Sequence, residues 1–287
     1  MRRTDISRWI DPGLRWASIL TYVFLFLPIV VVVVFSFNAG RHVTELTGFS
    51  FRWYVTAWTD PFVLRAFRTS LEIAVMSGLI STVLGTGTAI AIPSAPRWVR
   101  RVFQVLVNAA IVVPGIVLGL SLLIFVVAAT TWLNNWIAYL VPGSDVHLGL
   151  GFYSVVAGHA VFGSALVNVL VRTRLASLDP SLMEASSDLY APPMRTLFRV
   201  TLPLLAPAIL AGFLLAFTFS FDDFIVAFFT RGQSVTVPIY LFSSIRRGVS
   251  PVINALASTL LAITISLLGV VSLVYRRWSS RKTEEAA

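Results

Sequence analysis

The sequence contains no cysteine and only one lysine, Lys282, among its 287 residues. Without cysteine there can be no disulfide, thiolate metal site or cysteine nucleophile. The three histidines, His42, His147 and His159, are far apart in the chain and suggest no metal cluster. With Lys282 in the tail, the G-x-x-x-x-G-K-[ST] phosphate loop cannot occur. The sequence therefore predicts no cofactor and no nucleotide site of that type.

Charged residues are also scarce. They make up 12% of the chain, against about 25% in soluble domains, while hydrophobic residues make up 57%. The mean hydropathy is +0.84. This composition predicts a membrane protein.

The hydrophobic residues are gathered into runs long enough to cross a bilayer. The first, from Ala17 to about Phe37, follows a basic N-terminal segment and is too long for the apolar region of a signal peptide, so we predict an uncleaved span. No linker or repeat divides the chain. We predict one all-α membrane domain, residues 1–287, with six spans at about 17–37, 69–92, 103–129, 152–171, 204–229 and 253–275. Glycine and proline inside these runs permit close helix contacts or local unwinding; they are Gly85, Gly87, Pro114, Gly115 and Gly119.

The positions of the basic residues give an orientation. Most of them lie in the N-terminal segment, the second loop, the fourth loop and the C-terminal tail, and the positive-inside rule makes these segments cytoplasmic. Both termini are then on the cytoplasmic side. The net charge of +9 is distributed loop by loop and forms no contiguous basic face, which argues against nucleic-acid binding.

A polar segment interrupts the hydrophobic runs between Leu178 and Pro203. Asp179 is a suitable N-cap, and Pro180 suits the first helical position, so SLMEASSDL predicts a short helix that ends near Tyr190. Ala191 and the two prolines after it predict an extended break, followed by a second amphipathic turn in MRTLFRV. The loop 173–202 therefore predicts a helical docking element before the fifth span.

At these residues the chain resembles a known family. Glu184-Ala185-Ser186, Tyr190 and Leu202-Pro203 resemble the E-A-A-x-x-x-G and L-P loop of the integral-membrane permease subunits of bacterial ABC importers. The segments FDDFIVAFFTRG, VVPGIVLGLSLLIF from Val112 and SFNAG…FSFRWY from Ser36 resemble the spermidine/putrescine branch. The resemblance covers most of the chain from about Ser36 to Leu261.

The resemblance implies a six-helix, type I importer-like permease bundle in the bacterial cytoplasmic membrane. It also implies a cytoplasmic coupling helix that docks an ABC ATPase dimer, a second homologous permease subunit and an extracytoplasmic substrate-binding protein. ATP would be hydrolysed by the partner, so the chain itself is expected not to be an enzyme. The expected ATPase-coupling residues are Glu184, Ala185, Asp188, Leu189, Tyr190 and Pro203. Because the family has glycine where this chain has Tyr190, we expect the turn there to be made differently, with the ring packing into the ATPase.

The resemblance also implies a cationic cargo, with polyamines the leading class. Asp222 and Asp223 lie near the outer end of the fifth span, where a carboxylate is a functional candidate. Adjacent helical residues point about 100° apart, so we expect the two carboxylates to have different roles. Pro114 and Ser121 are further candidates for the pathway. Gly115 stands where polyamine members often carry an acidic residue, which leaves another small solute of the same family as the alternative cargo.

Two other classes of function remain open. A gradient-driven secondary transporter would be favoured by inverted repeats and by broken helices at the bilayer midplane, neither of which is evident in the sequence. An intramembrane enzyme would need His, Asp, Glu and Ser residues at corresponding depths in different spans, and no such constellation is apparent.

Overall fold

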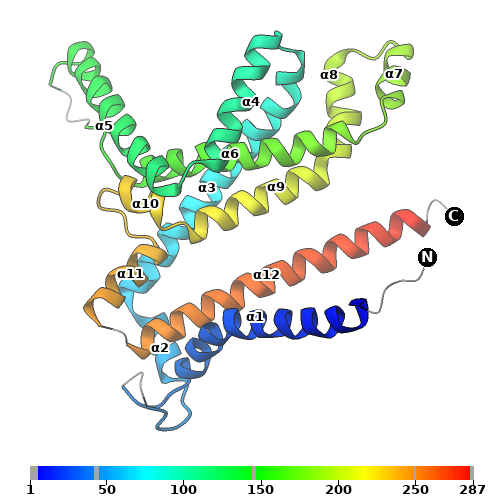
Figure 1. Ribbon diagram of the computed structural model, residues 1–287. Helices are drawn as coiled ribbons and strands as arrows, with labels where there is room; N and C mark the ends of the chain where they lie inside the picture. The colour runs from blue at the N-terminus through cyan, green and yellow to red at the C-terminus, as the bar shows by residue number, and fades with distance from the viewer. Residues whose placement is uncertain (1–5, 42–44, 144–146, 249, 285–287) are drawn as a thin grey trace. The chain divides into compact units, whose positions relative to one another are not determined.

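The computed structural model describes residues 6–41, 45–143, 147–248 and 250–284, so Arg2, Arg3 and His42 lie outside the described residues. Every regular element in the described ranges is a helix (Figure 1), and the one β-type pairing within them is an isolated bridge between Asn38 and Phe49. The prediction of an all-α protein is confirmed.

The helices follow one another with short connections. In chain order they are α1 (Ile6–Ser36), α2 (Arg52–Thr59), α3 (Pro61–Ala91), the 3₁₀ turn η1 (Ile92–Ser94), α4 (Arg97–Val112), α5 (Gly115–Leu140), α6 (Phe152–Ala176), α7 (Ser181–Asp188), α8 (Pro193–Thr196), the π-turn η2 (Leu197–Thr201), α9 (Leu202–Asp222), α10 (Ile225–Thr230), α11 (Val237–Arg247) and α12 (Pro251–Glu284). Within the described ranges, five segments are long and apolar enough to cross a membrane: Leu14–Ser36, Pro61–Ser94, Gly115–Leu140, Phe152–Ala176 and Pro193–Asp222. A shorter apolar helix covers Pro251–Ser266.

The segment expected as one span at 103–129 is divided. α4 ends at Val112, and α5 begins at Gly115 and continues to Leu140. Val113 is extended, with φ −61° and ψ 131°, because the ring of Pro114 disfavours the α conformation in the residue before it. Pro114 then occupies the N-cap of α5, where its missing N–H costs nothing. The apolar span therefore begins after the proline and extends beyond residue 129.

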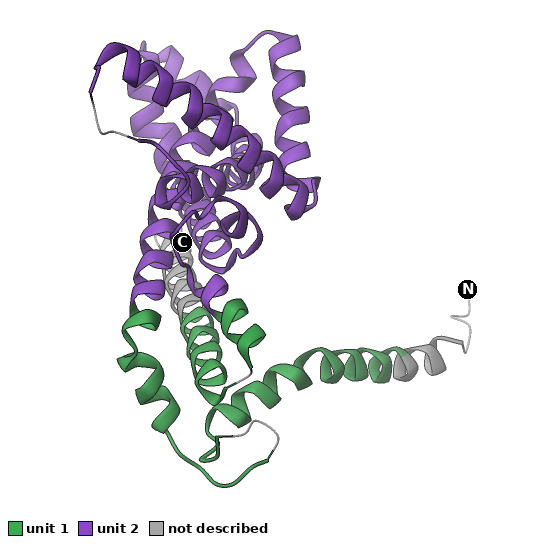
Figure 2. Ribbon diagram, turned by 90° about the vertical axis from the view of Figure 1, so that its left-hand side faces the viewer, with its two compact units in different colours: residues 1–64, 241–287 green, residues 65–240 purple. Residues whose placement is uncertain are grey.

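The chain forms two compact units (Figure 2), which we describe separately. The first contains residues 1–64 and 241–287, in which α1 and α2 both pack against α12. The indole of Trp58 donates a hydrogen bond to Thr259 Oγ1 at 3.4 Å, and the indole of Trp53 donates to the carbonyl of Asn38 at 2.8 Å. These contacts fix the short α2 at the end of the longer helices.

The second unit, residues 65–240, is organised around α6, which is the most buried of the long apolar helices. α6 and α9 lie side by side (Figure 1), and both contribute to a cluster of buried side chains at Ala89, Val167, Val171, Leu205 and Ala216. A second cluster contains Ile73, Val155, Val156, Ala227 and Ile239. Polar contacts join the same helices, as where Asn168 donates to Thr88 Oγ1 at 3.0 Å.

Gly85 shows how closely α3 approaches α6. A Cβ atom at this position would lie 2.6 Å from Val167 Cβ and 2.8 Å from the carbonyl oxygen of Ser164. Both distances are shorter than van der Waals contact, so the two helix backbones can pack at this separation only with glycine. Gly87, two residues along the same helix, has nothing within 4 Å of the equivalent position.

We therefore expect Gly85→Ala to destabilise the second unit by about 1–3 kcal/mol, the usual cost of overpacking. Gly87→Ala is the matched control and should cause no loss of stability, because the added methyl group meets open space. Thermal unfolding of the two variants in detergent measures the difference. Equal unfolding temperatures for both variants would show that the close approach at Gly85 does not limit packing.

Candidate coupling helix and buried polar cluster

The predicted docking helix is present as α7, Ser181–Asp188. Asp179 Oδ1 accepts the N–H of Ser181 at 3.0 Å, and this hydrogen bond lowers the pKa of the Asp179 carboxyl. The helix begins one residue later than expected, with Pro180 at the N-cap position. Because the pKa is lowered in the folded state, the contribution of Asp179 is present at neutral pH and is lost as the pH falls through that lowered pKa.

The end of α7 differs from the expectation. Tyr190 adopts φ 53°, in the left-handed region that the family glycine would occupy. Its N–H bonds to the carbonyl of Ser187 at 2.9 Å, and the N–H of Ala191 bonds to the carbonyl of Ser186 at 3.1 Å. These two bonds define a Schellman motif with Tyr190 at the C′ position. The expectation that the turn is made differently is therefore wrong: the hydrogen bonds that close the helix outweigh the Cβ penalty.

One side of α7 packs against the chain, and the other is exposed. Ser186 is buried and its hydroxyl pairs with that of Thr196 in α8 at 2.6 Å, while Thr201 Oγ1 lies 3.8 Å from the sulfur of Met183. The expected coupling residues Glu184, Ala185, Asp188, Leu189 and Tyr190 are all exposed. Tyr190 is 95% and Leu189 81% exposed, so the loop presents a small apolar tip.

The docking element connects to the fifth span without a second break. α8, η2 and α9 form one helical segment from Pro193 to Asp222, in which Pro203 lies at the start of α9. The π-turn at Leu197–Thr201 lies just before this proline. In a regular α-helix the proline ring would clash with the preceding turn, and the hydrogen bond from its missing N–H would be lost. One helical segment therefore runs from the residues that pack against α7 to Asp222.

The second notable feature is a buried polar cluster, Ser77, His159, Ser220 and Asp223, contributed by α3, α6 and the end of α9. Ser77 donates to Ser220 Oγ at 2.8 Å, and Ser220 Oγ lies 2.6 Å from His159 Nδ1. His159 Nε2 lies 3.2 Å from Asp223 Oδ2, at ion-pair distance without hydrogen-bond alignment. The His159 side chain is 0% exposed and that of Asp223 9%.

Two contacts in the cluster are hydrogen bonds: Ser77 donates to Ser220, and Ser220 Oγ pairs with His159 Nδ1, where the donor depends on the ring tautomer. His159 Nε2 lies beside Asp223 Oδ2 without a hydrogen-bond partner among the described residues. The cluster therefore joins α3, α6 and the end of α9 through polar contacts in an otherwise apolar interior.

The cluster corrects the sequence analysis, which found no constellation of His, Asp and Ser at corresponding depths. Three of the residues lie about eight residues from the predicted outer ends of their spans: Ser77, His159 and Ser220. This common depth could have indicated from the sequence that they meet. The arrangement does not support hydrolysis. Ser220 is 5% exposed and lies at Nδ1, whereas a serine nucleophile is accessible and is activated by Nε2.

The two expected pathway carboxylates lie in different environments. Asp222 ends α9 and is exposed, whereas Asp223 turns inward to His159 and accepts the N–H of Ala227 at 3.1 Å. Pro114 and Ser121 are exposed on α5, whose Gly119 packs closely against Phe229 of α10. Asp223 therefore belongs to the buried polar cluster, whereas the other expected pathway residues, Asp222, Pro114 and Ser121, do not.

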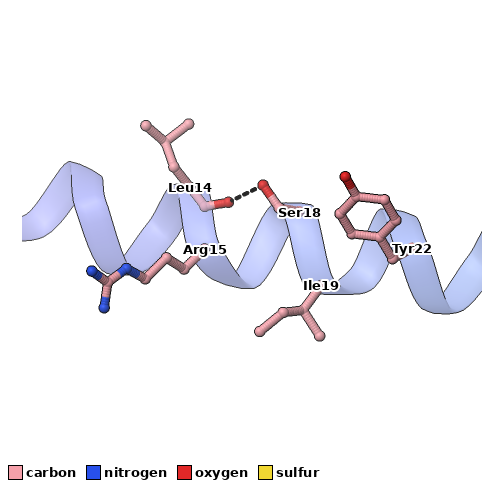
Figure 3. A pocket seen from close by; sticks show the side chains of 5 residues that line it. All are labelled: Leu14, Arg15, Ser18, Ile19 and Tyr22. Carbon is pink, nitrogen blue, oxygen red and sulfur yellow. Dashed lines mark hydrogen bonds between the residues drawn. The ribbon is translucent and has the colours of Figure 1, made fainter. Parts of the chain in front are cut away.

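A shallow hollow on α1 offers no comparable site. Leu14, Arg15, Ser18, Ile19 and Tyr22 line it, and all five come from the one helix (Figure 3). Ser18 donates to the carbonyl of Leu14 at 2.8 Å, which satisfies its hydroxyl within the helix. Among the described residues, the lining side chains all belong to α1, so the hollow is an exposed surface of that one helix.

The fold defined by these helices is that of ABC importer permeases. One solved structure, a bacterial ABC transporter involved in the import of the acidic polysaccharide alginate, superposes with a TM-score of 0.74 over 95% of this chain and 97% of that chain, at 16% identity. The MetNI methionine ABC transporter superposes with a TM-score of 0.56 over 75% of this chain and 93% of that chain, at 16% identity. The expected importer permease fold is confirmed.

Residues 81–285 match the family described as the binding-protein-dependent transport system inner membrane component. The chain belongs to this family of membrane transport subunits. It is 36% identical to the putrescine transport system permease protein PotI of Escherichia coli K12, over 88% of this chain and 87% of that protein. It is also 31% identical to the spermidine/putrescine transport system permease protein PotC of Haemophilus influenzae, over 90% of this chain and 94% of that protein. The resemblance stated from the sequence motifs is confirmed.

The backbone of Tyr190 gives a direct prediction. Tyr190→Gly should stabilise the end of α7 by about 1 kcal/mol, because glycine enters the left-handed region without a Cβ penalty. Hydrogen exchange at the amide of Ala191, which closes the turn, should then slow about fivefold. Tyr190→Ala is the matched control: it removes the ring, keeps the Cβ atom and should leave the exchange rate unchanged. Equal slowing in both variants would assign the effect to loss of the ring.

Proposed function

We propose that this chain is a permease subunit of an ATP-driven ABC importer that carries polyamines across the bacterial cytoplasmic membrane. The observation that carries the proposal is its similarity along nearly its whole length to permeases named for putrescine and spermidine transport. An exposed carboxylate at the end of α9, Asp222, is suited to a cationic cargo. A carboxylate within or beside a membrane span is costly, and it is retained where it serves a function.

The proposed assembly contains a second homologous permease, an ATPase dimer and an extracytoplasmic binding protein. One similar solved importer is described in complex with a substrate-bound periplasmic protein, which supports the last of these partners. Because the sequence excludes a lysine-containing phosphate loop, ATP hydrolysis is assigned to the partner. With the basic segments inside, α7 and both termini face the cytoplasm.

Transport proceeds by alternating access. Closure of the ATPase dimer moves α7, whose exposed residues Glu184, Ala185, Asp188, Leu189 and Tyr190 form the docking face. The inward contacts of Ser186 and Met183 hold α7 against the start of the long helical segment. Movement therefore reaches α9 through Pro203 and rotates the end that carries Asp222 and Asp223. Pro114 and Ser121 of α5 are proposed to contact the same pathway.

Charge reversal in the docking face tests the coupling. Glu184→Lys should reduce ATP-driven uptake at least about tenfold, because an exposed carboxylate near the helix N-terminus is replaced by an opposite charge. Membrane insertion should remain normal, since Glu184 is exposed. Glu45→Lys, at an exposed carboxylate outside the loop, is the control. Undiminished uptake with a normally assembled ATPase would contradict the coupling role.

The proposed cargo is tested by uptake into proteoliposomes that contain the whole importer. Labelled putrescine and spermidine should accumulate only with internal ATP and binding protein. A neutral sugar and an amino acid serve as comparison solutes. ATP-dependent uptake of one of these instead of the polyamines would favour the alternative cargo of the same family. Uptake driven by an ion gradient without ATP would favour a secondary transporter.

A further inference from the structure

The helix break after Asp222 lies next to the buried polar cluster. α9 ends at Asp222, Asp223 is extended with ψ 125°, and α10 begins at Ile225. A break of this kind leaves backbone groups at two helix ends without intrahelical partners. Asp223 satisfies one of them, because its Oδ2 accepts the N–H of Ala227 in the first turn of α10. Asp223 therefore joins the two helices through its side chain.

His159 contacts the same carboxylate oxygen. Its Nε2 lies 3.2 Å from Asp223 Oδ2, and its Nδ1 is held by Ser220, one turn before the break. Ser77 of α3 holds Ser220 in turn. The imidazole thus bridges α9 before the break and the residue within it. Because the ring is fully buried, its orientation is set by these contacts.

This arrangement separates the two adjacent carboxylates. Asp223 is turned into the helix packing, and Asp222 is left exposed one residue earlier. The direction of Asp222 depends on the backbone at Asp223, since one peptide unit joins them. A change in the contact between His159 and Asp223 would therefore also move Asp222.

We propose that His159 is a positioning residue of the transport pathway: by holding Asp223 in the break between α9 and α10, it directs the carboxylate of Asp222 toward the cationic cargo. The inference rests on the proposed function for the identity of that cargo. It assigns charge recognition to Asp222 and a structural hydrogen-bonding role to Asp223.

The carboxylates are distinguished by their amide isosteres. Asp222→Asn removes the charge and should raise the KM for spermidine or putrescine about tenfold, with the maximal rate within twofold of the wild type. Asp223→Asn keeps an acceptor oxygen for Ala227 but weakens the contact with His159, so it should raise the KM less, by about threefold. An increase in KM for Asp223→Asn equal to that for Asp222→Asn would overturn the division of roles.

His159 is tested by the same uptake measurement. His159→Leu should raise the KM about fivefold or more without a comparable fall in maximal rate, and it should add nothing further when combined with Asp222→Asn. His159→Gln, whose amide can donate to Asp223, should restore a KM near the wild-type value. His147→Leu is the matched control, since His147 is exposed outside the cluster. A lower maximal rate with unchanged KM in His159→Leu would indicate a structural role only and would overturn the proposal.

A second measurement is independent of the cargo. Because the chain has no cysteine, Asp222→Cys introduces a single thiol into this subunit, and its reaction with a charged thiol reagent reports its exposure. The labelling rate in the intact complex should change about tenfold on adding His159→Leu and return on replacing it with His159→Gln. An unchanged rate would overturn the positioning role even if the wild-type complex transports no polyamine. Absence of polyamine uptake with the expected labelling pattern would contradict the proposed cargo alone.

Discussion

Within a bilayer, a helix can be interrupted only where other groups satisfy its freed backbone atoms, because no water is available to do so. This constraint governs the fifth span. The break between α9 and α10 occurs where the carboxylate of Asp223 accepts a backbone N–H and is itself held by His159. The buried polar cluster thus makes the break possible, and the separation of the two carboxylates follows from it.

The end of α7, just before the start of this helical segment, shows a related competition between hydrogen bonding and backbone strain. Tyr190 occupies a left-handed position that ordinarily favours glycine, yet two backbone hydrogen bonds close the end of α7 around it. The energy of an unsatisfied carbonyl is comparable to the Cβ penalty, so the Schellman motif forms with a tyrosine. The ring is left exposed.

A continuous helical segment lies between the end of α7 and the break at Asp223. The π-turn before Pro203 accommodates the proline without interrupting the segment from Pro193 to Asp222. The inward packing of Ser186 and Met183 attaches the docking helix to its beginning. α7 is therefore attached by side-chain contacts to the start of the helical segment that ends at Asp222.

The sequence was informative wherever a local rule applied. Hydropathy identified a membrane protein, the capping signals at Asp179 and Pro180 located α7, and the motif around Glu184 identified the family. The division of the third predicted span was missed, although the local effect of Pro114 on Val113 could have indicated it. The turn at Tyr190 was also misjudged, because the backbone hydrogen bonds that stabilise it depend on the geometry of the whole helix end.

By itself the sequence determined the membrane class and the family. Only the tertiary structure decided that His159, Ser220 and Asp223 meet, and that Asp222 remains exposed. Distance along an apolar run gives the depth of a residue at about 1.5 Å per residue. The rotation of each helix about its axis decides which side chains face one another. That rotation is set by close packing between segments far apart in the chain, as at Gly85 against Val167.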